Sequence, residues 1–183
     1  AGQCIKLTDK AAGAHCEKSY TKSRLQVINP GFEAESVTNR AVPGWETVTE
    51  DGAGVMTIDA MGSRAWISVG VLSQTLTTVP IDGEKYTVSV NVGTDASYVA
   101  GRYRVRLMSG VYTLAEATGE VVPGAPKKTI TLSAFGREAY SQPLVVWLEG
   151  VRPNTDSMPE GFLVTFDDIE VAAYEYRCAA TDW

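Results

Sequence analysis

Apolar and polar residues alternate along many short segments of this chain, and this period of two constrains its fold more than any other feature. Residues 85–93 read KYTVSVNVG, residues 102–107 read RYRVRL, and residues 144–149 read LVVWLE. Successive side chains of a β-strand point to opposite faces, so these segments are typical of strands with one buried face. The same reasoning predicts further strands at residues 26–28, 55–58, 65–69, 73–77, 112–118, 128–133 and 162–176.

Turn signals separate the predicted strands. Asp82-Gly83 and Ser109-Gly110 favour short turns, and Pro-Gly pairs at residues 30, 43 and 123 mark loops. After residue 24, no segment repeats apolar residues at helical spacing for three turns, which argues against parallel βαβ units. We therefore predict an all-β fold, a two-sheet antiparallel β-sandwich over residues 25–183, preceded by an N-terminal arm at residues 1–24 with one helical turn near residues 8–14.

Length, charge and cysteine content exclude several classes of protein. A chain of 183 residues with 44% hydrophobic and 21% charged residues fits one globular domain. A net charge of −6 argues against a nucleic-acid partner, and no apolar stretch approaches the roughly 20 residues of a membrane span. The chain opens Ala-Gly-Gln-Cys without the pattern of a signal peptide, which leaves the compartment open. The pairing of Cys4, Cys16 and Cys178 also stays open.

The chain holds few residues suited to catalysis. His15 is its sole histidine and lies in the arm, and no G-x-S-x-G motif is present. Asp167 and Asp168 are adjacent, but neighbours on a strand face opposite sides, so they cannot share a cleft unless a bulge turns one of them. We therefore predict no catalytic residue and no enzymatic activity.

The polar faces of the clearest strands suggest a binding surface instead. If these strands share one sheet, Asn91 lies on one side together with Arg102, Arg104, Arg106, Trp147 and Glu149. An aromatic ring among hydrogen-bonding side chains suits a sugar, and guanidinium groups suit an anionic sugar or another carboxylate. Tyr98, in a loop between two strands, is a further candidate. Two alternatives stay open: Arg104 or Arg106 pairs across strands with Glu149 or Glu116, or this face meets the arm or another subunit.

Four motifs occur in the same order in a known family. They are VINPGFE from Val27, VPGW at residues 42–45, LSQTLTTVPIDGEKYTVSVNVG from Leu72, and FDDIEV from Phe166. In this order they resemble the jelly-roll carbohydrate-binding modules and their galactose-binding-like relatives. Hapalindole-type alkaloid cyclases, which have calcium and a carboxylic acid at an apolar pocket, also resemble this pattern.

The resemblance implies a jelly-roll sandwich whose first and last strands lie side by side. It also implies a structural calcium ion near the two chain ends, with Glu33 and Asp168 supplying side-chain oxygens, and Ca²⁺ prefers six to eight oxygen ligands. Alternatively, these two residues are exposed loop carboxylates or accept hydrogen bonds from backbone N–H groups at a turn.

These observations favour a non-catalytic, carbohydrate-binding-module-like protein whose partner is a polysaccharide or glycan. An extracellular, cell-surface or virion location is expected. One alternative is a structural or decoration subunit of a phage or virus particle, assembled as a homo-oligomer or within a larger protein assembly. Another is a calcium-dependent enzyme on the same scaffold, such as an alkaloid cyclase.

Overall fold

The computed structural model describes residues 16–34, 41–49, 53–57, 63–94, 101–152 and 163–180. These residues form strands, turns and loops, and the all-β prediction is confirmed. None of them belongs to a helix that could cross a membrane. The strands are β1 (Cys16–Arg24), β2 (Glu46–Thr49), β3 (Ala53–Thr57), β4 (Ser63–Ile67), β5 (Gly70–Thr75), β6 (Lys85–Gly93), β7 (Gly101–Ser109), β8 (Tyr112–Val121), β9 (Lys128–Phe135), β10 (Leu144–Val151) and β11 (Val164–Ala180).

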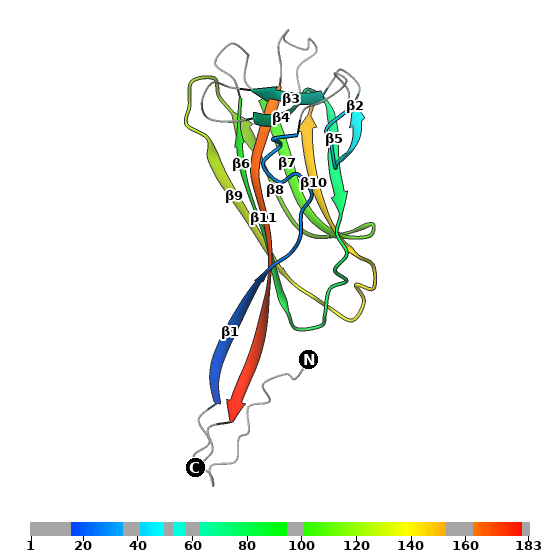
Figure 1. Ribbon diagram of the computed structural model, residues 1–183, viewed down its shortest axis with the longest axis vertical. Coiled ribbons are helices and arrows are strands. Elements are labelled where there is room, and N and C mark those ends of the chain that lie inside the picture. The colour runs from blue at the N-terminus through cyan, green and yellow to red at the C-terminus, as the bar shows by residue number, and fades with distance from the viewer. Residues whose placement is uncertain are drawn as a thin grey trace.

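The strands form two antiparallel sheets packed face to face as a sandwich (Figure 1). The β11 sheet has the order β3-β4-β11-β6-β9, and β1 pairs with β11 outside this order. The β7 sheet has the order β2-β5-β10-β7-β8. The predicted two-sheet jelly-roll sandwich is therefore confirmed, and its first and last strands are neighbours.

The core lies between the sheets and consists of the apolar side chains that the alternation predicted to point inward. On β6, every second residue from Tyr86 to Val92 is fully buried. Val105 and Leu107 on β7 and Val146 and Leu148 on β10 meet them from the other sheet and are also fully buried. Burial of one such side chain stabilises a fold by roughly 1.5–3 kcal/mol, so this core holds the two sheets in fixed positions.

Two glycines allow the predicted turns. Gly83, in the turn before β6, has a φ of 81°, and Gly110, between β7 and β8, has a φ of 55°. Residues other than glycine are strained at such φ angles. The turn at Gly110 makes β7 and β8 a hairpin, which places Arg106 opposite Glu116.

The first strand begins earlier than the sequence predicted. Residues 16–24, assigned to the arm, form β1 and pair with β11 along its C-terminal half, and Figure 1 shows this ribbon extending away from the sandwich. Residues 21–24 of β1 are all exposed. Because this part of the ribbon has no buried face, it lacks the apolar alternation on which the prediction relied. Residues 1–15, with His15, Cys4 and the predicted helical turn, lie outside the described residues.

Residues 26–28, predicted as a strand, form none. The backbone of Ile28 bonds to a side chain instead: its N–H donates to Gln74 Oε1 at 2.7 Å, and its carbonyl accepts from Gln74 Nε2 at 2.9 Å. Gln74 is buried, so its amide takes the place that a neighbouring strand would otherwise fill. The prediction was wrong here because this segment's alternation is too short to show which partner its backbone finds.

Candidate ligand-binding face

The outer face of the β7 sheet, which points away from the core, brings most of the predicted ligand-binding residues together. In the register of β7 and β10, Trp147 lies opposite Arg106 and Glu149 lies opposite Arg104. One step further along, Val151 lies opposite Arg102. The intervening residues of both strands point into the core, so these side chains share the outer face.

Glu149 links two other side chains at the centre of this face. Its Oε2 atom accepts hydrogen bonds from Trp147 Nε1 at 3.1 Å and from Arg104 Nη1 at 3.3 Å. The Glu149 side chain is only 19% exposed and that of Arg104 is 31% exposed. One carboxylate therefore fixes both an aromatic ring and a guanidinium group, and it balances the charge of Arg104.

The other two arginines differ in how closely a carboxylate approaches them. Arg106 Nε lies 2.5 Å from Glu116 Oε2 on β8. Arg102 Nε lies 3.8 Å from Glu120 Oε1, and the Glu120 side chain is 69% exposed. Exposed ion pairs of this kind contribute little to stability. The structure therefore contains the alternative pairing, in which Arg104 and Arg106 pair across strands with Glu149 and Glu116.

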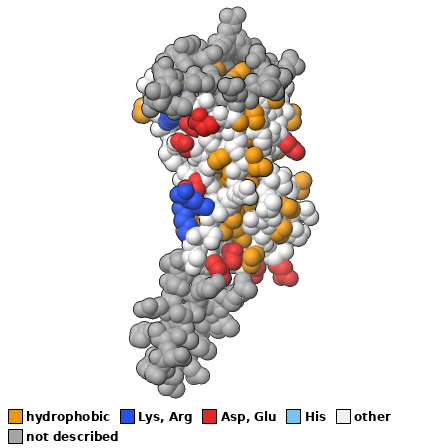
Figure 2. Space-filling model, viewed as in Figure 1, with side chains coloured by type: hydrophobic (Ala, Val, Ile, Leu, Met, Phe, Trp, Pro, Cys, Tyr) orange, Lys and Arg blue, Asp and Glu red, His pale blue; other side chains and the backbone are white. Residues whose placement is uncertain are grey.

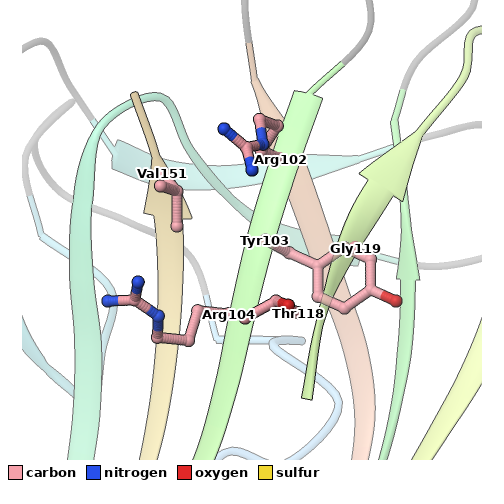
Figure 3. A pocket seen from close by; sticks show the side chains of 6 residues that line it. All are labelled: Arg102, Tyr103, Arg104, Thr118, Gly119 and Val151. Atoms are coloured by element: carbon pink, nitrogen blue, oxygen red, sulfur yellow. The ribbon is translucent and has the colours of Figure 1, made fainter. Parts of the chain in front are cut away.

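A shallow depression of about 170 Å³ lies on this face, and its lining residues are Arg102, Tyr103, Arg104, Thr118, Gly119 and Val151. Figure 3 shows Arg102 and Arg104 on β7, with the Val151 side chain of β10 at a level between their guanidinium groups. The Tyr103 ring extends toward β8, where Gly119 leaves room for it: a Cβ atom on Gly119 would lie 2.4 Å from the Tyr103 hydroxyl. Pockets for drug-sized ligands have roughly 300–1,000 Å³, so this depression suits one ring of a larger ligand.

Two predicted ligand-binding residues do not join this face. The condition that the alternating strands share one sheet fails for β6, because β6 belongs to the β11 sheet. Asn91 therefore lies on the opposite sheet, where its Nδ2 donates to Asp168 Oδ2 at 2.9 Å and its Oδ1 accepts from the Thr129 hydroxyl at 2.7 Å. Period-two alternation shows which face a residue occupies but not which sheet its strand joins. Tyr98 lies outside the described residues.

The outer face of the β11 sheet holds a buried acid that the sequence analysis did not select. The register of β11 shifts between Asp167 and Glu170, and Asp168 has a φ of 51°, as in a β-bulge. The Asp168 N–H donates to Asp167 Oδ1 at 2.9 Å, and Lys127 Nζ lies 3.5 Å from Asp167 Oδ2. A bulge was the one condition under which the sequence allowed Asp167 and Asp168 to share a cleft.

Asp167 is 5% exposed, and its environment favours the protonated form. Burial, followed by the neighbouring carboxylate of Asp168, raises the pKa of Asp167 above its ordinary value. The Asp168 N–H and the Lys127 ammonium oppose this shift without cancelling it. The signal in the sequence was the Asp-Asp pair itself, but the position of the bulge decides which carboxyl is buried.

The predicted calcium ligands each accept a hydrogen bond from the protein. Glu33 Oε1 accepts from the Ser63 N–H at 3.2 Å, and Asp168 Oδ2 accepts from Asn91. The Ile169 N–H donates to the Pro30 carbonyl at 3.0 Å, which ties the NPGF segment to the bulge. Among the described residues, no three His, Cys, Asp or Glu side chains gather as a metal site would require. Two carboxylates fall short of the six to eight oxygens of a calcium shell, so calcium at Glu33 and Asp168 stays a prediction.

The two antiparallel sheets define a jelly-roll sandwich. More particularly, the chain belongs to the HpiC1-like family: the model of that family, described as HpiC1 cyclase, matches residues 23–172. A comparison with curated proteins gives no match. The prediction that the protein is not an enzyme is therefore wrong, because the family to which it belongs is that of a cyclase. The sequence analysis relied on histidines and nucleophile motifs, and neither feature identifies a family whose model is described as that of a cyclase.

Solved structures of carbohydrate-binding modules share the fold. A structure entitled "CBM4 structure and function" matches with a TM-score of 0.52 at 13% identity, over 81% of this chain and 99% of that one. TmCBM61 in complex with β-1,4-galactotriose matches with a TM-score of 0.52 at 15% identity, over 81% and 98%. The CBM22-1 xylan-binding domain of Paenibacillus barcinonensis Xyn10C matches with a TM-score of 0.51 at 13% identity, over 78% and 90%. At these identities the likeness shows the fold alone.

Proposed function

We propose that this protein binds a saccharide on the outer face of the β7 sheet. The observation that carries the proposal is the arrangement around Glu149, which holds Trp147 and Arg104 through a single carboxylate oxygen beside the depression. A ring and a cation fixed in this way lose little conformational freedom on binding, so less of the interaction energy is lost to ordering.

The chemistry of the face fits a sugar ring. The C–H groups of one pyranose of a bound saccharide pack on Trp147, which lies outside the lining of the depression. The hydroxyl groups of a sugar in the depression accept from guanidinium donors and exchange hydrogen bonds with Thr118. Related folds lend support, since one neighbour is entitled a xylan-binding domain and another is in complex with β-1,4-galactotriose. Assembly on a phage or virus particle, or as a homo-oligomer, stays a prediction.

Native gel electrophoresis with xylan, β-1,4-galactan or polygalacturonate in the gel tests the proposal. We expect the full chain to be retarded by at least one polymer, and Trp147→Ala to weaken binding about 30-fold, because loss of a central aromatic costs roughly 2 kcal/mol. Trp66→Ala is the matched control, since Trp66 is also partly exposed but lies on β4 of the other sheet. Normal retardation of Trp147→Ala, or no retardation of the full chain by any of the three polymers, would refute the proposal.

A second function, ring closure of a small substrate, is favoured by the family match and by the buried acid Asp167. Burial raises the pKa of the Asp167 carboxyl, and a carboxyl in its protonated form can donate a proton to an alkene or similar group to start cyclisation and recover a proton when the ring product loses one. Incubation with a hapalindole-type cyclisation precursor, followed by liquid chromatography and mass spectrometry, tests this function. We expect Asp167→Asn to abolish turnover and Glu170→Gln, which changes an acid of the same strand that pairs with Lys22, to keep it. Turnover by Asp167→Asn would remove the acid from this role.

A further inference from the structure

We infer that the depression on the β7 sheet is specific for an anionic sugar and that it holds a uronic-acid carboxylate between Arg102 and Arg104. This inference rests on the proposed saccharide binding and narrows it to one class of ligand. It also assigns to Arg102 the discrimination between an acidic and a neutral sugar. Among the described contacts, Arg102 touches no aromatic group.

The lining of the depression is basic. Two of its six residues are arginines, and none of the described lining residues is an acid. Glu149 and Glu120 pair with these arginines from outside the lining. The depression therefore presents guanidinium groups to a ligand while the balancing carboxylates lie to the side. A neutral sugar would give these guanidinium groups no charged acceptor.

The three arginines of this face differ in how closely a glutamate pairs with each of them. Arg106 is held at 2.5 Å by Glu116, and Arg104 is held at 3.3 Å by the largely buried Glu149. Arg102 has the longest pair, 3.8 Å, and its partner Glu120 is the most exposed of the three acids. Release of Arg102 from Glu120 thus costs less than release of the other two, because an exposed carboxylate is readily solvated.

The guanidinium of Arg104 also has unused hydrogen-bonding capacity. Its Nε atom is buried and has no hydrogen-bond partner among the described residues. Because this Nε is buried, Arg104 can offer a carboxylate only its Nη groups, and together with the guanidinium of Arg102 these give an acid group charged N–H donors from two residues. Val151 and Thr118, which also line the depression, offer an apolar contact and a hydroxyl to the rest of the sugar ring.

The net charge of the protein cannot explain a preference for an acidic sugar. The chain carries a net charge of −6, so a polyanion is repelled by the protein as a whole. Preference for an acidic polymer over its neutral form must then come from particular basic side chains. Substitution of single arginines can therefore test the inference.

The experiment compares polygalacturonate with the same polymer after its carboxyl groups have been reduced to primary alcohols. Isothermal titration of the full chain with short oligomers of each isolates the carboxylate from linkage and ring stacking. We expect the acidic oligomer to bind at least tenfold more tightly, since a hydrogen bond between charged groups contributes about 1.5–3 kcal/mol. Arg102→Gln should remove most of that preference. Arg24→Gln, the control on β1 away from this face, should retain it.

Each of the other outcomes contradicts one specific claim of the inference or of the proposed function. Equal binding of the two oligomers overturns the anionic specificity and leaves saccharide binding in place. An acidic preference that survives in Arg102→Gln, with circular dichroism showing a folded variant, overturns the assigned role of Arg102. If neither oligomer binds but β-1,4-galactotriose does, only the inference fails. If none of the three binds, and a xylan oligomer does not bind either, the proposed function fails with it.

Discussion

The contact between Gly119 and Tyr103 gives a prediction that joins packing to the candidate site. A Cβ atom at Gly119 would lie 2.4 Å from the Tyr103 hydroxyl oxygen, 2.7 Å from Cζ and 2.9 Å from Cε1. Tyr103 is 5% exposed and belongs to the core, so its ring has little room to withdraw. Gly119→Ala must therefore push the ring or separate β7 from β8.

The expected cost follows from these distances. Overpacking of a core typically costs about 1–3 kcal/mol, and the alanine recovers about 0.4–1 kcal/mol by restricting the unfolded chain. We expect Gly119→Ala to lower the free energy of unfolding by about 1–2 kcal/mol. Because Gly119 and Tyr103 also line the depression, the variant should weaken saccharide binding as well.

A double-mutant cycle identifies the cause. Tyr103→Phe removes the nearest atom of the clash but leaves Cζ, so it should restore about half of the stability lost in Gly119→Ala. Urea denaturation followed by circular dichroism measures all four proteins. If Gly119→Ala is as stable as the parent, or if the two changes are additive within error, the clash is not the cause and the reasoning fails.

Two further predictions concern the β11 sheet. Because the folded-state pKa of Asp167 is raised, its ionisation costs folding free energy; this cost is absent below the ordinary value of 3.8 and grows as the pH rises through the folded pKa. We expect Asp167→Asn to gain stability relative to the parent over that rise, measured by urea denaturation across pH, whereas a relative loss above pH 4 would contradict the raised pKa. If calcium binds at Glu33 and Asp168, a chelator should lower the melting temperature of the parent but not that of Glu33→Gln; equal shifts in both would exclude Glu33 as a ligand.

The sequence predicted the fold well where alternation was long. Residues 85–93, 102–107 and 144–149 all lie in strands, and every second residue from Tyr86, Tyr103 and Leu144 lies in the core. Alternation depends only on one buried face, which is a local property of a strand. It failed for β1, whose described side chains are exposed, and at Ile28, whose backbone finds the buried amide of Gln74.

The candidate site was predictable only in part. Trp147, Glu149 and the arginines of β7 lie on adjacent strands, so a shared face followed from their spacing once the strands were paired. Asn91 was misplaced because sheet membership depends on long-range pairing that period-two alternation does not encode. Asp167 was missed because one extra residue in the bulge at Asp168 sets which acid is buried, and residues in this bulge have no distinctive pattern.

The central claim is that the outer face of the β7 sheet is where the ligand binds. Backbone amide NMR of the full chain during titration with a galactan or galacturonate oligosaccharide tests it most directly. The account predicts that saturable shifts cluster around Arg102, Arg104, Trp147 and Glu149. Shifts that cluster instead around Asp167 and Asn91 on the other sheet would contradict it, as would a spectrum that does not change.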